Sequence, residues 1–203
     1  MPKIFDEADK AAIRDRLVTE GKKLFQRYGL RKTSVEELAR AAGIAKGTFY
    51  HFFESKEDLC FAIFDREEEL MAADVQAIIT RYDDPARTFR ALIDFSIDFI
   101  RSDSLMTRLR ESGEMELLAR GVSPEKLAAH LDHDVGTAQL LIKSLRAKGT
   151  RVTIKPDVLA GVLRAFVALT LQEKVIGEPI FKQVMNLFAD WIAAGLLKGK
   201  GKP

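Results

Sequence analysis

Residues 33–56, TSVEELARAAGIAKGTFYHFFESK, decide the fold of this chain, because they predict two short helices across a tight turn and then the start of a third helix. Thr33 and Ser34 each precede a glutamate by three residues, and either pair forms a capping box that begins a helix. Gly43 ends this helix, since glycine suits the left-handed position after a helix. The stretch therefore has the outline of a helix-turn-helix.

The second short helix begins with small and basic residues, and its phenylalanines fit a core. Lys46 and Gly47 come first, and Thr48, Tyr50 and His51 follow. A helix of this kind after a glycine turn is typical of the helix that reads DNA in this motif.

Positive charge is concentrated around the motif. Residues 21–56 contain eight Lys and Arg but three acidic residues, a net charge of +5 in a chain whose net charge is +2. The remaining residues therefore carry a net charge of −3. Charge alone favours an ordinary solvated surface, but charge together with the motif favours a face that binds phosphates.

The bulk properties are those of a soluble globular protein. The 203 residues, 47% apolar and 31% charged, fit one large domain or two small ones. The N-terminus lacks the apolar stretch of a secretory signal, and the most apolar segment, residues 158–171, is interrupted by Arg164 and too short for a membrane span. One cysteine excludes an internal disulfide and suits a reducing compartment. We therefore expect a cytoplasmic protein with no membrane partner.

Helical periodicity covers nearly the whole chain, so we expect an all-α protein of about nine helices. A helix-turn-helix domain is predicted for residues 1–56 and a second helical domain for residues 57–203. No linker separates them, because Ser55 begins a helix that runs to about residue 79. Residues 151–154 favour a strand but are too few to pair, so a connector is expected. The other helices are expected at 9–28, from 85 onward, and at 105–109, 124–148, 158–176 and 180–197.

The last two helices are unusually apolar. Residues 158–176 are apolar on most of the helix circumference, and residues 180–197 carry two apolar stripes. A helix of this kind must be covered on both sides, either by a second subunit or by the core of its own monomer. We predict the homodimer, with an interface that contains Leu163, Phe166, Val184, Phe188 and Trp191.

Residues 43–59, GIAKGTFYHFFESKEDL, resemble the hallmark of the TetR/AcrR family of one-component bacterial regulators. Upstream residues agree with the family pattern as well, namely Thr33, Leu38, Ala39, Ala42, Gly43 and Ile44. The specific resemblance spans residues 13–64, and beyond it only size, helix number and the apolar last helices agree. The resemblance implies that residues 1–56 bind DNA and that residues 57–203 bind a ligand and dimerise.

Seven residues are predicted to contact DNA. Lys46 reaches a phosphate or a guanine edge, and Thr48 reaches a base or a thymine methyl. Gly47 lets the backbone approach a phosphate. The other predicted contacts are Thr33 at a helix N-terminus, Tyr50 and His51 in the groove, and Lys56 as a phosphate clamp.

Two residues depart from the family pattern. Ala45 stands where serine is frequent, so the second helix lacks a side-chain cap worth about 1 kcal/mol. Glu54 places a negative charge where lysine is frequent.

An effector pocket is predicted among aromatic and apolar side chains of the second domain, although ordinary core is the alternative at each position. The residues are Phe61, Phe64, Phe89, Ile93, Phe99 and Phe166. They favour a small, apolar effector.

Two histidines and the single cysteine could be reactive, but we predict ordinary structural roles for them. His130 and His133 lie three residues apart on a helix with acids beside them, but without a third distant ligand we predict a polar face and no metal. Cys60 fits a buried thiol better than an oxidation sensor.

The motifs of hydrolases, metalloproteases and nucleotide-binding enzymes are missing from the sequence, so no catalytic residue and no cofactor is predicted. We predict a ligand-responsive repressor that leaves a palindromic operator on double-stranded DNA when its effector binds. The alternatives are a helix-turn-helix protein that acts through protein contacts and an all-helical enzyme.

Overall fold

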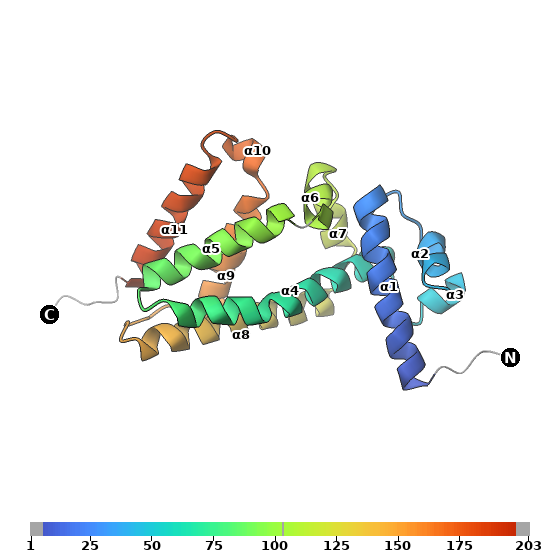
Figure 1. Ribbon diagram of the computed structural model, residues 1–203, viewed down its shortest axis with the longest axis horizontal. Helices are drawn as coiled ribbons and strands as arrows, with labels where there is room; N and C mark the ends of the chain where they lie inside the picture. Colours follow the sequence, from blue (N-terminus) through green and yellow to red (C-terminus); the bar gives the residue numbers. More distant parts are fainter. Residues whose placement is uncertain (1–5, 103, 198–203) are drawn as a thin grey trace. The chain divides into compact units, whose positions relative to one another are not determined.

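A computed structural model describes residues 6–102 and 104–197 of the protein (Figure 1). Every regular element in these residues is a helix, which confirms the predicted all-α class, and there are eleven helices rather than about nine. They are α1 (Glu7–Tyr28), α2 (Val35–Ala41), α3 (Lys46–Phe49), α4 (Lys56–Arg81), α5 (Pro85–Ser102), α6 (Ser104–Glu111), α7 (Met115–Arg120), α8 (Pro124–Ala147), α9 (Pro156–Thr170), α10 (Glu173–Ile176) and α11 (Phe181–Leu197).

Two departures from the predicted helices account for the higher number. Gly113 interrupts the chain as expected, at φ +69°, but a further short helix, α7, follows it. The helix predicted for residues 158–176 is wrong as a single element, because α9 ends at Thr170. The Thr170 hydroxyl donates to the Val167 carbonyl at 2.6 Å, and the chain leaves the helix at Leu171 before α10 begins. Local side-chain bonds of this kind compete with the helical ladder.

The chain divides by its internal packing into two compact units. The first unit comprises Met1–Leu70 and Asp103–Lys126, and the second comprises Met71–Ser102 and Leu127–Pro203. Helices α4 and α8 each contribute residues to both units. The boundary predicted after residue 56 separates a DNA-binding part from a part that binds a ligand and dimerises, and it stays a prediction.

The first unit is built around one hydrophobic cluster to which distant parts of the chain contribute. Phe25 of α1, Phe49 of α3 and Leu59 of α4 are fully buried in it. Leu105 and Leu109 of α6 lie in the same cluster. Each such side chain contributes about 1.5–3 kcal/mol by leaving water. The segment after residue 103 therefore forms part of the core that holds the helix-turn-helix.

In the second unit, α5 packs against α9 and α11. Phe89, Phe166 and Phe181 are buried in its core. Outside the core, Arg90 Nε of α5 donates to an Asp190 carboxylate oxygen of α11 at 2.7 Å. The elements of this unit are thus joined by apolar packing and by a surface ion pair.

Lys148, just after α8, caps the C-terminal end of α4. Its ammonium donates to the Ile79 carbonyl at 3.1 Å and also to the Tyr82 carbonyl. The last carbonyls of a helix have no partner inside the helix, so a cation at this end stabilises it.

In the part of the chain that the structure describes, no helix is both long enough and apolar enough to cross a lipid bilayer.

Candidate nucleic-acid interface

Helix α2 begins with a complete capping box. The Ser34 N–H donates to Glu37 Oε2 at 2.8 Å, and the Glu37 N–H donates to Ser34 Oγ at 3.2 Å. The backbone N–H of Ser34, and then its hydroxyl, lower the pKa of the Glu37 carboxyl. Of the two pairs that the sequence left open, the structure therefore forms Ser34 with Glu37.

Thr33 lies inside the protein. Only 1% of its surface is exposed, and its Oγ1 donates to the Gly29 carbonyl at 2.7 Å. The hydroxyl closes the turn between α1 and α2 and is not offered to solvent. The placement of the hydroxyl does not support the predicted phosphate contact of Thr33, which stays a prediction.

The turn between α2 and α3 is made by the glycine that the sequence indicated. Gly43 has φ +69°, which confirms its left-handed position. The Ile44 N–H donates to the Ala39 carbonyl at 2.9 Å, and the Gly43 N–H donates to the Arg40 carbonyl at 3.1 Å. These two bonds form a Schellman motif. Arg16 of α1 supports the turn, because its Nε donates to the carbonyl of Ala42, the C-cap residue of α2, at 3.1 Å.

Helix α3 is one turn long and depends on its neighbours. Its N-cap residue, Ala45, makes no side-chain cap bond, as the sequence predicted. Phe49 is fully buried and contacts the Phe53 ring at a centroid distance of 6.0 Å. The predicted DNA contacts on the outer side are exposed at Lys46, Gly47, Tyr50 and His51 and half-buried at Thr48.

Lys56 is placed differently from a simple phosphate clamp. Its Nζ donates to the Arg31 carbonyl at 3.1 Å and to the Thr33 carbonyl at 3.0 Å. An ammonium group has three donors. Two of them hold the α1–α2 turn, so Lys56 has a structural task beside any contact with a phosphate.

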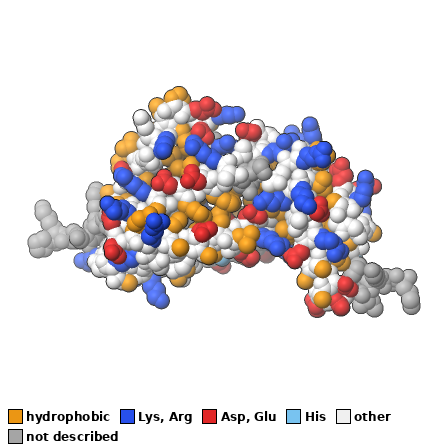
Figure 2. Space-filling model, viewed as in Figure 1, with side chains coloured by type: hydrophobic (Ala, Val, Ile, Leu, Met, Phe, Trp, Pro, Cys, Tyr) orange, Lys and Arg blue, Asp and Glu red, His pale blue; other side chains and the backbone are white. Residues whose placement is uncertain are grey.

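Part of the positive charge that the sequence concentrates in residues 21–56 is balanced by acids. Lys22 pairs with Glu67 at 2.9 Å, and Lys23 pairs with Glu20 at 2.7 Å. On the face drawn in Figure 2, Lys and Arg side chains of the first unit lie beside acidic ones. The field that a phosphate meets is therefore weaker than the local net charge of +5 indicates.

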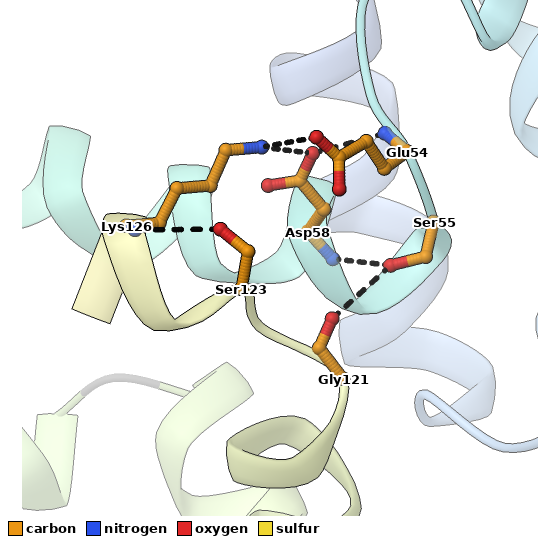
Figure 3. A network of polar contacts seen from close by, with 6 residues as sticks. All are labelled: Glu54, Ser55, Asp58, Gly121, Ser123 and Lys126. Atoms are coloured by element: carbon orange, nitrogen blue, oxygen red, sulfur yellow. Dashed lines mark hydrogen bonds and ion pairs between the residues drawn. The ribbon is translucent and has the colours of Figure 1, made fainter.

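A polar network fixes the start of α4 (Figure 3). The Asp58 N–H donates to Ser55 Oγ at 3.0 Å, which confirms Ser55 as the cap of this helix. The nearly buried Asp58 carboxylate accepts the Glu54 N–H at 3.0 Å and the Lys126 ammonium at 2.6 Å. Lys126 also lies 4.0 Å from the Glu54 carboxylate, so the acid that departs from the family pattern has a cation beside it.

The helix-turn-helix is similar to that of known proteins. The description "Bacterial regulatory proteins, tetR family" matches residues 17–63, the span from mid-α1 to the first turns of α4. Over these residues the chain is similar to the TetR family. An HTH-type transcriptional regulator of Staphylococcus aureus (strain USA300) is similar at 25% identity over 104 residues. These residues make up 51% of this chain and 56% of that protein, so the chain spans little more than half the length of the curated relatives that it matches.

Two solved structures share the fold of nearly the whole chain. A TetR-family transcriptional regulator from Pectobacterium atrosepticum has a TM-score of 0.69 at 21% identity, over 95% of this chain and 98% of that one. RolR in complex with resorcinol has a TM-score of 0.66 at 19% identity, over 98% of this chain and 97% of that one. These identities establish the fold alone.

The residues predicted to line an effector pocket are divided between the two hydrophobic clusters of the chain. Phe61 and Phe64 pack against the cluster of the first unit. Phe89, Ile93 and Phe166 are buried in the cluster of the second, and Phe99 of the second unit is half-buried. The structure does not gather all six residues in one cluster, and their role stays a prediction.

The residues predicted for the dimer interface differ in exposure. Trp191 of α11 is 63% exposed, and its ring contacts Phe188 edge-on at 5.6 Å. Leu163, Val184 and Phe188 are half-buried. Phe166 is buried in the core of its own unit, so only a rearrangement of that core would let it contact a second subunit.

Two further residues singled out in the sequence are Cys60 and His133. Cys60 is buried, which confirms that interpretation. His133 is exposed, and the neighbouring Asp134 pairs with Arg164 at 2.9 Å.

Sequence reasoning missed the residues that hold the interface from a distance. Lys126 reaches Asp58 across 68 positions of sequence. Glu114 reaches Leu30 across 84 positions. Neither belongs to a local motif, so no signal in the sequence pairs them with their partners.

Ser34→Ala tests the capping box. We expect the pKa of Glu37 to rise only part of the way towards 4.5, because the backbone N–H of residue 34, the larger cause of the lowering, still donates. Since the folded pKa is lowered, the contribution of Glu37 to stability is complete above pH 4.5 and is lost as pH falls through the folded pKa. An NMR titration of the Glu37 carboxyl carbon in both proteins measures this, and equal values would contradict it.

Proposed function

We propose that this TetR-family chain is a transcriptional repressor that binds a palindromic operator as a homodimer and responds to a small-molecule effector. The observation that supports this most directly is the two-sided character of α3. Phe49 anchors the helix in the core, while Lys46 and Gly47 at its start face solvent. A short helix held in this way can enter a major groove by its N-terminal residues.

Three residues of α3 have distinct tasks on DNA. Lys46 supplies a charged donor for a phosphate or for a guanine edge, and Thr48 supplies a hydroxyl and a methyl for a base. Gly47 has no side chain to separate the backbone from a phosphate. Because DNA is the partner, the chain works in the cytoplasm.

The dimer is proposed from the outer face of α11. Leu187 is 50% exposed and Trp191 is 63% exposed, and they lie four residues apart on one side of the helix. Met185 and Ala189 are buried on the other side. Large apolar side chains in a row on a water-facing helix indicate a partner surface. A second copy related by a two-fold axis implies operator half-sites about one helical turn of DNA apart.

An effector enters this proposal through a difference in affinity between two conformations. A ligand shifts the equilibrium only as far as it binds one conformation better than the other. RolR, which shares the fold, was solved with resorcinol, a small aromatic molecule. The phenylalanines of the second core, Phe89 and Phe166 among them, favour an effector of similar size and apolar character.

A gel-shift titration with the DNA upstream of the protein's own gene, at two salt concentrations, tests the function. We expect binding that weakens as salt rises. Lys46→Ala should lower the affinity and leave thermal stability unchanged, because Lys46 is exposed. Lys56→Ala should lower both, because it also releases the carbonyls of the α1–α2 turn. Binding that is absent, or indifferent to salt, would contradict the proposal.

Gly47→Ala separates stability from DNA binding. A Cβ at residue 47 meets no atom within 4 Å, and alanine is the better helix former by up to about 1 kcal/mol, so the melting temperature should stay the same or rise. DNA affinity should fall by about tenfold if the backbone approaches a phosphate closely. Gly136→Ala in α8 is the matched control, since its Cβ also meets nothing. Equal DNA affinity in the two variants would show that Gly47 is not at the interface.

Trp191→Asp tests the dimer by sedimentation at micromolar concentration. We expect this variant to sediment as a monomer of 22.8 kDa and the wild type as a dimer, because a buried unpaired carboxylate opposes the interface. Val175→Asp is the control, since Val175 is an apolar residue that is 82% exposed on α10. A wild-type monomer, or a dimer that survives Trp191→Asp, would refute the predicted interface.

A further inference from the structure

The turn between α1 and α2, residues 29–34, is held by two charged side chains from different parts of the chain. Lys56 of α4 donates to the Arg31 and Thr33 carbonyls, as described above. The second side chain is Glu114, in the connection between α6 and α7. One group binds carbonyls of the turn and the other binds its N–H groups, so the turn is fixed through both kinds of backbone group.

The Glu114 carboxylate accepts two consecutive backbone N–H groups, one on each oxygen. The Leu30 N–H donates to Oε2 at 2.8 Å, and the Arg31 N–H donates to Oε1 at 3.1 Å. Only 6% of Glu114 is exposed. A buried carboxylate is costly unless hydrogen bonds satisfy it, and bonds to a charged acceptor are stronger than neutral ones.

The surroundings of the turn leave room for this carboxylate. Gly29 has φ +84° and ψ 167°, a conformation that is essentially restricted to glycine. A Cβ at residue 29 would lie 2.9 Å from Glu114 Oε2 and 3.4 Å from Arg108 Nε of α6. The glycine therefore permits both the backbone conformation and the close approach of the α6–α7 segment.

The turn leads directly into the helices of the helix-turn-helix. Ser34, at the end of the turn, is the N-cap of α2. Gly43 then joins α2 to α3 through two backbone hydrogen bonds. A displacement of the turn therefore changes the direction from which α3 presents its outer face.

We propose that Glu114 is a positioning residue for DNA recognition, which holds the α1–α2 turn in the conformation that α2 and α3 need on the operator. The role rests on the proposed function, because it acts through the DNA-binding surface. Glu114 itself contacts no DNA. The position of α6–α7 thereby becomes a condition for binding, since both hydrogen bonds are lost if this segment moves away from the turn.

Glu114→Gln tests this role in the full-length chain. Glutamine has the same shape, but one of its two terminal groups is an amide NH₂ that cannot accept an N–H bond. The control is Glu116→Gln, two residues along the chain, where the exposed carboxylate pairs with Arg120 on the surface. Both variants remove one negative charge from the first unit.

The two possible effects of Glu114→Gln on DNA affinity have opposite signs. Loss of a negative charge near DNA strengthens binding by electrostatics alone, and the control variant measures this effect. Loss of the turn conformation weakens binding, by about tenfold if a tenth of the molecules keep it. In gel shifts at two salt concentrations we expect weaker binding by Glu114→Gln with an unchanged salt dependence, because no phosphate contact is lost. Glu116→Gln should bind as the wild type or slightly more tightly.

Amide hydrogen exchange provides a second measurement that does not depend on DNA. In the wild type the Leu30 and Arg31 amides should be protected, and in Glu114→Gln they should exchange faster while the amides of α1 stay protected. Circular dichroism at the assay temperature tests whether both variants are folded.

The outcomes separate the two proposals. A wild type that binds no DNA contradicts the proposed function. Wild-type binding together with equal affinities of Glu114→Gln and Glu116→Gln overturns the role of Glu114 alone. Unprotected Leu30 and Arg31 amides in the wild type also overturn it, even if the variant does not fold.

Discussion

A four-residue helix has no stability of its own in water, so α3 exists only because the rest of the first unit holds it. The burial of Phe49 is the central interaction. Its ring lies in one cluster with side chains of α1, α4 and α6, and the outer side of α3 is exposed as a result. The Gly43 turn fixes the direction of the helix relative to α2. Packing supplies the stability, and the glycine turn supplies the geometry.

Around this anchor, charged side chains hold backbone groups that helices leave unsatisfied. Lys56 and Glu114 bind the α1–α2 turn, and Asp58 binds the backbone just before α4. Lys126 then binds Asp58 from the start of α8. The bonds of Glu114 and Lys126 join groups that are 84 and 68 positions apart in sequence, so the conformation of the helix-turn-helix depends on residues 104–126 as well as on its own.

The local features of the fold were predictable from short stretches of sequence. Gly43 ends α2, Ser55 caps α4, and Ala45 leaves α3 without a side-chain cap, because each of these features involves residues at most five apart. Helix ends were less predictable where neighbouring bonds compete. α9 ends at Thr170 although the apolar pattern of the sequence continues to residue 176, so periodicity does not reveal this end.

The side chains of the candidate interface were likewise predictable only in part. Lys46, Gly47, Tyr50 and His51 were expected at the surface and lie there, since α3 and the residues after it have one apolar side and one polar side. Thr33 and Lys56 belong to the same motif, yet their side chains bind the backbone of the α1–α2 turn. A motif describes which residue types occur together, whereas their partners depend on the path of the chain between them.

The sequence by itself therefore determined the all-α class, the helix-turn-helix and the resemblance to the TetR family, because capping, glycine turns and helical periodicity act over a few residues. Only the tertiary structure decided that residues 104–126 share a core with the helix-turn-helix and that Glu114 and Lys126 hold its backbone. The physical reason is that a buried carboxylate or an ammonium group takes the partner that folding brings within about 3 Å, and this distance is set by the packing of the whole unit.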